Sequence, residues 1–134
     1  MSAPKPYLLF PGTAREALTY YHQVFGGELT LTTFEQFGRH DGPPEAIAHG
    51  ILAGAVSLYA ADTSGDEEPF GSTGLMFSLL GTTVAAELRT WFDALADGGT
   101  IRQALQQRPW GASDGQVVDR YGLCWLVGFE DSSS

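Results

Sequence analysis

The sequence contains a single cysteine, Cys124, and no apolar run that approaches the length of a membrane span. One thiol cannot build an internal disulfide framework or a cysteine-based zinc cluster. A transmembrane helix needs roughly 20 consecutive apolar residues. We therefore expect no membrane partner, and we expect a cytoplasmic location because nothing in the chain requires an oxidising compartment.

Basic residues are also scarce: seven lysines and arginines stand against 16 aspartates and glutamates, for a formal net charge of −9. Neutralising phosphates requires clustered lysine and arginine, so we expect no nucleic-acid partner. The 17 glycines do not form a dinucleotide-binding or phosphate-binding motif. The acidity is typical of a soluble protein, and it would also attract a cationic ligand.

The clearest positive feature is an internal repeat offset by about half of the 134 residues. The stretch that begins at Gly12 reads GTAREALTYYHQVFGGEL, and the stretch that begins at Gly81 reads GTTVAAELRTWFDALADGGTI. The aligned features are the first glycine, a pair of aromatic residues and a closing pair of glycines. Two copies indicate duplication of one supersecondary unit, because a solenoid needs at least about three.

Each copy predicts an amphipathic helix that ends at paired glycines. In the first copy Thr13 and Glu16 have the spacing of a capping box, and Gly26-Gly27 ends the helix. The apolar stripe of the first helix is Ala14, Ala17, Leu18, Tyr21 and Phe25, and that of the second is Val84, Leu88, Trp91, Phe92 and Leu95.

Strand-like segments flank both helices in the same order. In the first half they are Tyr7–Phe10, Glu28–Phe34, Ile47–Ala53 and Ala55–Ala61, with a tight hairpin at Gly54. In the second half they are Leu75–Leu79, Thr100–Leu105, Gly115–Val118 and Leu123–Phe129. The predicted fold class is α+β, built from two tandem βαβββ modules. The segments Gln36–Pro44 and Asp62–Thr73 are loops, rich in glycine, proline and acid.

The duplicated βαβββ unit resembles the vicinal-oxygen-chelate superfamily, which includes glyoxalase I, bleomycin-resistance proteins and extradiol dioxygenases. Three blocks are similar to its PhnB-like branch: PYLLFPGTAREALTYYHQVFGGEL at 6–29, IAHGILAGAVSLYAAD at 47–62 and PWGASDGQVVDRYGLCWLVG at 109–128. The resemblance implies a single glyoxalase-like domain over 1–134, an eight-stranded open cup and a homodimer. Module one would span about 4–62, a linker about 63–72 and module two about 73–130.

Enzymes of this superfamily usually hold a divalent metal on the first and last strands of each module. The resemblance places those positions near Pro6–Leu8, Leu58–Ala60, Gly74–Met76 and Leu126. None of these segments contains a good donor for a divalent metal. We therefore expect no metal and no cofactor, and enzymatic activity stays an open question.

Five residues are candidates to line a ligand pocket. His49, in the middle of a strand, is either a hydrogen-bonded structural residue or a pocket donor or base. Tyr7 and Tyr59, on the first and fourth strands, would orient a polar group or serve only the core. Trp110, in a glycine-rich loop, would stack on a planar or cationic ligand or cover the second sheet. Phe77 would supply an apolar wall.

The leading hypothesis is thus a protein that binds a small molecule in the cup without a metal. One alternative is a metal-dependent lyase, isomerase or dioxygenase of the same superfamily, with His49 as the acid–base group. Another is a dimeric interaction module that has no ligand. The sequence leaves open whether the modules pair within one chain or between chains, and whether the loop at 36–44 closes over the pocket.

Overall fold

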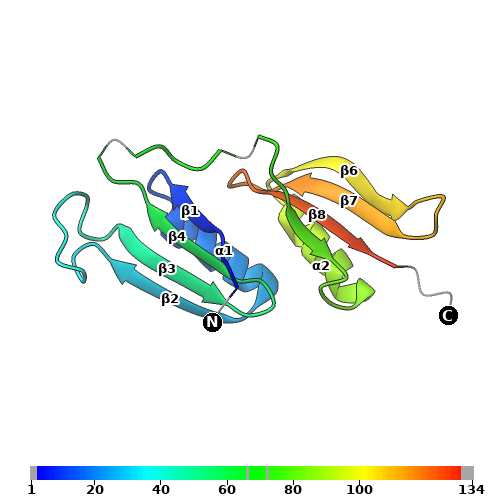
Figure 1. Ribbon diagram of the computed structural model, residues 1–134, viewed down its shortest axis with the longest axis horizontal. Helices are drawn as coiled ribbons and strands as arrows, with labels where there is room; N and C mark the ends of the chain where they lie inside the picture. Colours follow the sequence, from blue (N-terminus) through cyan, green and yellow to red (C-terminus); the bar gives the residue numbers. More distant parts are fainter. Residues whose placement is uncertain (1–2, 66, 72, 131–134) are drawn as a thin grey trace. The chain divides into compact units, whose positions relative to one another are not determined.

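The computed structural model describes residues 3–65, 67–71 and 73–130 (Figure 1). The chain divides into two compact units, Met1–Phe70 and Gly71–Ser134. No helix in the described ranges is long and apolar enough to span a bilayer.

The first unit is one four-stranded sheet with one helix. Its elements are β1 (Tyr7–Phe10), α1 (Ala14–Phe25), β2 (Glu28–Thr33), β3 (Ile47–Ala53) and β4 (Leu58–Asp62). The strand order is β1-β4-β3-β2, with β1 parallel to β4 and the other neighbours antiparallel. The parallel pair is possible because α1 and two strands intervene between β1 and β4 along the chain.

The second unit repeats this topology. Its elements are β5 (Phe77–Leu80), α2 (Ala85–Ala96), β6 (Thr100–Gln107), β7 (Ser113–Val118) and β8 (Cys124–Phe129). The order is β5-β8-β7-β6, and β5 is parallel to β8. The predicted α+β class and tandem βαβββ organisation are confirmed, and both sheets are open. The enclosure of one cup by the two sheets stays a prediction.

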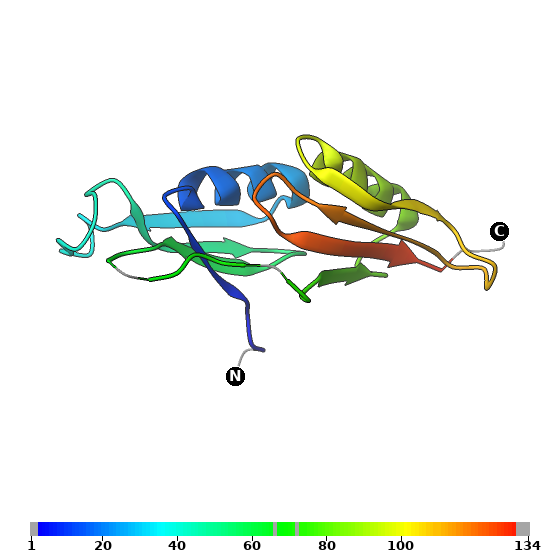
Figure 2. The same cartoon turned by 90° about the horizontal axis from the view of Figure 1, so that it is seen from above.

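The helix of each unit covers one face of its own sheet (Figure 2). All five residues of the predicted α1 stripe are buried. The contact with β3 is close: a Cβ at Gly50 would lie 2.4 Å from Leu18 Cδ1, so glycine lets the helix approach the sheet. Four of the five predicted α2 residues are buried as well, but Val84 is 69% exposed because it precedes the first helical turn as the N-cap.

The predicted capping box at Thr13 and Glu16 is wrong, because the Thr13 side chain makes no cap hydrogen bond. The buried Asp62 carboxylate at the end of β4 serves the helix start instead. Its Oδ1 accepts a hydrogen bond from Ala14 N at 2.8 Å, and its Oδ2 accepts one from Ile47 N at 2.9 Å. A carboxylate at a helix N-terminus is favoured by the helix dipole as well as by the hydrogen bond.

Both helices end before paired glycines, as predicted. Gly26 has φ +74° and Gly27 has φ +94°, a region that side chains with a Cβ rarely adopt. Gly27 is also crowded: a Cβ there would lie 2.4 Å from the Ala53 carbonyl oxygen. In the second unit Gly98 has φ +78° after the helix.

Several strand boundaries differ from the sequence-based prediction by one to three residues. Strand β4 begins at Leu58, because residues 54–57 form the connection from β3, in which Ser57 Oγ and the Gly54 backbone hydrogen-bond. The predicted linker at 63–72 lies partly against the first unit: Phe70 N donates to Leu9 O at 2.7 Å. Positions 66 and 72 of that linker lie outside the described residues.

Candidate ligand-binding site

The face of the first sheet opposite α1 carries three of the five predicted pocket residues. Since Gly50 lies under α1, its neighbours His49 and Ile51 point to the other face. Tyr59 lies opposite Ile51, and Tyr7 lies opposite Tyr59. Paired residues of adjacent strands share a face, so all of these side chains project away from the helix.

Tyr7, His49 and Tyr59 form a compact group on this face, which we call the ring cluster. The Tyr7 hydroxyl lies 2.9 Å from His49 Nδ1, at hydrogen-bond distance. The Tyr7 and His49 rings are stacked, with centroids 5.6 Å apart. The Tyr59 ring meets both edge-on, at 6.2 Å from Tyr7 and 5.7 Å from His49. The three rings support one another from three different strands.

The ring cluster is partly open to solvent. Tyr7 is 48% exposed, and His49 and Tyr59 are half-buried. Burial raises the pKa of the Tyr7 phenol above its ordinary value; the Arg39 charge opposes this shift and the Glu67 charge adds to it. The phenol therefore stays protonated through the neutral range. Arg39 and Glu67 both belong to segments outside the sheet. Charged side chains of both signs therefore lie near the aromatic surface of the cluster.

Arg39 connects the loop at 36–44 to the segment after β4. Its guanidinium lies 4.2 Å from the centre of the buried Phe34 ring. It donates from Nε to Asp41 Oδ1 at 2.9 Å and from Nη2 to Ser64 Oγ at 3.1 Å. Glu67 in turn accepts hydrogen bonds from the Ser64 backbone and hydroxyl. The loop is therefore held by specific contacts near Tyr7.

Sequence reasoning missed Arg39 and Glu67. Glu67 had a readable signal, because Ser64 and Glu67 have the S-x-x-E spacing that favours a local side-chain-to-backbone hydrogen bond. Arg39 had no comparable local signal, because an arginine two residues before an aspartate is common in glycine-rich loops. Its proximity to Tyr7 depends on tertiary structure.

The other two predicted pocket residues belong to the second unit. Phe77 lies opposite Trp125 on β8, and the two ring centroids are 5.2 Å apart. Trp125 is buried, and Phe129, on the same side of β8, lies under the Arg89 guanidinium of α2. Phe77 is therefore on the face that α2 covers, where its side chain is half-buried.

Trp110 is 72% exposed in the turn between β6 and β7. The turn is held by hydrogen bonds from Arg108 N to Ala112 O and from Gly111 N to Arg108 O. Arg108 is also fixed to Asp114 by an ion pair of 2.7 Å. A contact between Trp110 and a ligand stays a prediction.

The second unit does not repeat the ring cluster. Aligning Gly12 with Gly81 and matching the strand registers places Met76 at the position of Tyr7. The same registers place Gln116 at the position of His49 and Cys124 at that of Tyr59. The open faces of the duplicated units have therefore diverged, and only the first carries stacked rings joined by a hydrogen bond at these positions.

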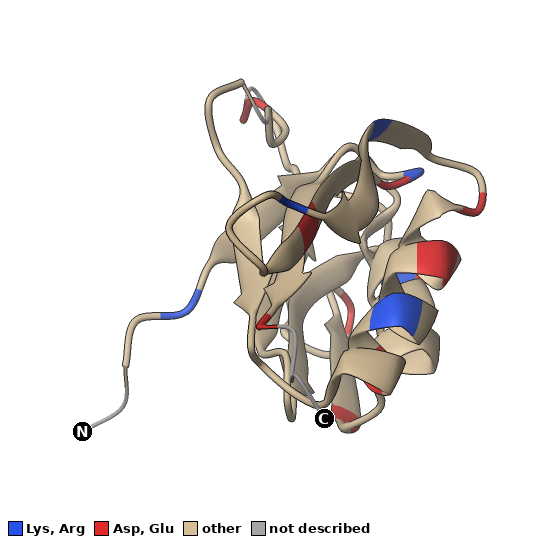
Figure 3. Cartoon of the chain, turned by 90° about the vertical axis from the view of Figure 1, so that its right-hand side faces the viewer, with Lys and Arg blue, Asp and Glu red and all other residues tan. Residues whose placement is uncertain are grey.

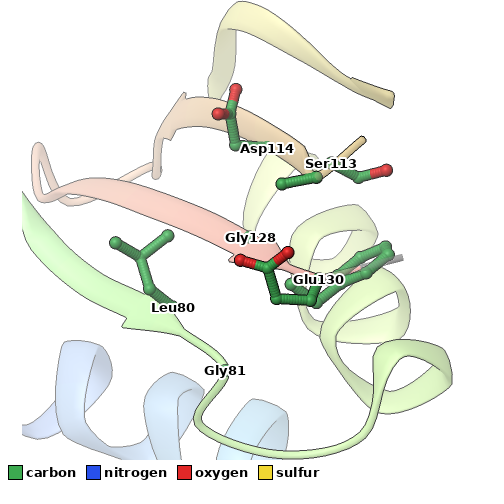
Figure 4. A pocket seen from close by; sticks show the side chains of 8 residues that line it. Leu80, Gly81, Ser113, Asp114, Gly128 and Glu130 are labelled. Carbon is green, nitrogen blue, oxygen red and sulfur yellow. The ribbon is translucent and has the colours of Figure 1, made fainter. Parts of the chain in front are cut away.

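The second unit has a separate pocket of about 250 Å³ at the end of β5, β7 and β8 (Figure 4). A Cβ at Gly128 would lie 2.8 Å from Leu80 Cδ2. Its lining includes Leu80, Gly81, Ser113, Asp114, Gly128 and Glu130. No predicted site residue lines it.

The divalent metal implied by the family resemblance does not fit the residues at the implied positions. Tyr7 and Tyr59 offer phenols, and the phenol of Tyr7 is held in its protonated form. Met76 and Leu126 offer a thioether and an alkyl group, neither of which is a hard donor. In the ranges that the structure describes, no three His, Cys, Asp or Glu side chains gather closely enough to hold a metal ion.

On the side of the chain shown in Figure 3, acidic and basic positions are scattered over helix and loop segments and do not gather by sign. The chain carries 16 acidic against seven basic residues. This distribution resembles a solvated surface rather than the basic stripe of a nucleic-acid-binding protein.

Comparison with known proteins is consistent across sequence and structure. The family model described as Glyoxalase/Bleomycin resistance protein/Dioxygenase superfamily matches residues 4–127. Protein YjdN of Escherichia coli (strain K12) is 29% identical, over 91% of each chain. Protein PA1353 from Pseudomonas aeruginosa is 34% identical, with a TM-score of 0.81 over 98% of this chain and 100% of that one.

A Bacillus cereus PhnB protein, described as a putative 3-demethylubiquinone-9 3-methyltransferase, has a TM-score of 0.77. The match covers 96% of this chain and 99% of that one, at 20% identity. At this identity the likeness concerns the fold. PhnB-like proteins are therefore among the structural neighbours, as the sequence blocks predicted.

Proposed function

Because this chain belongs to the Glyoxalase/Bleomycin resistance protein/Dioxygenase superfamily, we propose that it binds a small organic molecule against the ring cluster, without a bound metal. The observation that carries this proposal is the hydrogen-bonded stack of Tyr7 on His49, with Tyr59 edge-on to both. A fold of this superfamily hosts many activities, so the site itself has to support the function.

The composition of the ring cluster suits a ligand with a planar or cationic part. Aromatic rings offer apolar faces for stacking and attract cations through their quadrupole. A tyrosine 48% exposed beside a half-buried histidine leaves part of this surface available to a ligand. The net charge of −9 adds long-range attraction for a cation, whereas the charges of Arg39 and Glu67 near Tyr7 oppose each other.

Saturation-transfer NMR with two probes, benzyltrimethylammonium and acetophenone, tests this proposal. We expect saturation transfer to at least one probe, and we expect its loss in the double variant Tyr7→Leu/Tyr59→Leu. Phe37→Leu is the matched control, because Phe37 is an aromatic residue of the same unit, 54% exposed and outside the cluster. Transfer that survives in the double variant, or transfer to neither probe, would overturn the proposal.

We also propose that the protein is a cytoplasmic homodimer. Family resemblance supports the dimer, and the only cysteine is a buried free thiol that needs no oxidising compartment. Native mass spectrometry of freshly purified protein is expected to give twice the chain mass of 14.4 kDa without a metal adduct. A monomer at all concentrations would refute the dimer, and a stoichiometric divalent-metal adduct would favour the metalloenzyme alternative.

A further inference from the structure

We infer that Tyr7 fixes the tautomer of His49, so that the ring cluster selects ligands that carry a hydrogen-bond acceptor, such as a carbonyl, beside a planar group. This inference rests on the proposed function of the cluster. It assigns Tyr7 the role of a positioning residue and His49 the role of the group that contacts the ligand's acceptor.

The direction of the hydrogen bond between Tyr7 and His49 follows from the chemistry of the two groups. A phenol is a far stronger acid than a neutral imidazole N–H, and an unprotonated imidazole nitrogen is a better acceptor than a phenol oxygen. Over their 2.9 Å separation, the Tyr7 O–H therefore donates and His49 Nδ1 accepts. Burial keeps the phenol protonated, so this donor persists across the neutral pH range.

An acceptor at Nδ1 requires the proton of a neutral histidine to lie on Nε2. The structure gives Nε2 of His49 no protein partner in the described chain. In the same ranges no buried side-chain nitrogen or oxygen lacks a hydrogen-bond partner. His49 Nε2 is therefore accessible to solvent. In this tautomer the only N–H donor of the imidazole is Nε2–H.

The ring contacts restrict the orientation of this donor. Tyr7 stacks on His49 with an interplanar angle of 27°, and Tyr59 meets His49 edge-on at 69°. A ligand that stacks on the cluster would have its polar edge beside an oriented donor, and a ligand without an acceptor would leave that donor without a partner. Such a donor favours a ligand with an acceptor by about the net value of one hydrogen bond, because an apolar ligand edge that covers the donor removes its water partner.

The first part of the test reads the tautomer directly and needs no ligand. Long-range ¹H–¹⁵N correlation spectra at about pH 8.5, where histidine is neutral, distinguish the two tautomers. We expect the Nε2–H form for His49 in the wild type and a shift toward a mixture in Tyr7→Phe. Tyr59→Phe keeps the ring and is expected to leave the tautomer unchanged. An Nδ1–H form in the wild type would overturn the inference.

The second part compares acetophenone with α-methylstyrene, in which a methylene group replaces the carbonyl oxygen. We expect acetophenone to bind about fivefold more tightly to the wild type, the value of one net hydrogen bond, and the ratio to approach one in Tyr7→Phe. A ratio of one in the wild type, with both probes bound, would overturn the selectivity while leaving the proposed function in place. Binding of neither acetophenone nor α-methylstyrene would overturn the selectivity, and the proposed function would then depend on benzyltrimethylammonium binding alone.

Discussion

The Asp62 carboxylate shows how one buried side chain can join three elements. It is 5% exposed at the end of β4, and its two oxygens accept from the first residue of α1 and the first residue of β3. A buried carboxylate is costly unless hydrogen bonds satisfy it, and here two backbone donors do so. Asp62 therefore fixes the start of α1 relative to the sheet that carries the ring cluster.

Replacing Asp62 is expected to destabilise the protein. Asp62→Ala leaves the Ala14 and Ile47 amides without their partner, at a cost of about 3 kcal/mol in the free energy of unfolding. Urea unfolding followed by circular dichroism measures this loss. Glu68→Ala, which removes an exposed acid from the same unit, is expected to change stability by less than about 0.5 kcal/mol. Equal effects in the two variants would contradict the role of Asp62.

Asp41, in the loop at 36–44, accepts a hydrogen bond from Arg39. Hydrogen bonds from Arg39 lower the pKa of Asp41 from 3.8 to about 2. The stabilisation from this pair is therefore complete above about pH 4 and is lost as the pH falls through about 2. In Arg39→Gln the pKa of Asp41 is expected to return toward 3.8, as measured by carboxyl ¹³C titration. Arg89→Gln in the second unit is the control; an unchanged pKa in Arg39→Gln would refute the assignment.

At the scale of elements, the α1 boundaries show what sequence patterns specify and what they do not. The apolar period and Gly26-Gly27 predicted the helix and its end, because both signals are local. The start was attributed to Thr13 and Glu16, whereas the donor at Ala14 is satisfied by Asp62, 48 residues away. When the capping residue comes from a distant strand, no local sequence spacing predicts where the helix begins.

The end of α1 gives an element-scale prediction with an internal control. Gly26 and Gly27 both have positive φ, but only Gly27 is crowded, by the Ala53 carbonyl. Gly26→Ala is expected to cost about 1 kcal/mol from backbone strain alone. Gly27→Ala is expected to cost clearly more, because the connection after β3 must also move. Equal costs in urea unfolding would show that the close approach does not contribute.

At the scale of the whole molecule, the repeat made the βαβββ order of both units predictable, since duplicated units carry the same periodicities twice. Strand alternation places His49 on the face opposite Gly50, which lies under the helix. The face that Phe77 occupies could not be predicted, because one apolar strand residue has the same sequence pattern on either face. Its place on the helix-covered face follows from its register with Trp125. The proximity of Arg39 to Tyr7 required the folded loop.

The proposed binding surface lies in the first unit, because the open faces of the two units have diverged. Tyr7, His49 and Tyr59 correspond by register to Met76, Gln116 and Cys124, which offer no stacked rings. The most direct measurement is therefore a ¹H–¹⁵N NMR titration of the labelled chain with acetophenone. We expect saturable shifts at amides of β1, β3 and β4 around the ring cluster and none that saturate at the pocket beside Gly128. Saturable shifts confined to the second unit would contradict the assignment of the binding surface to the ring cluster.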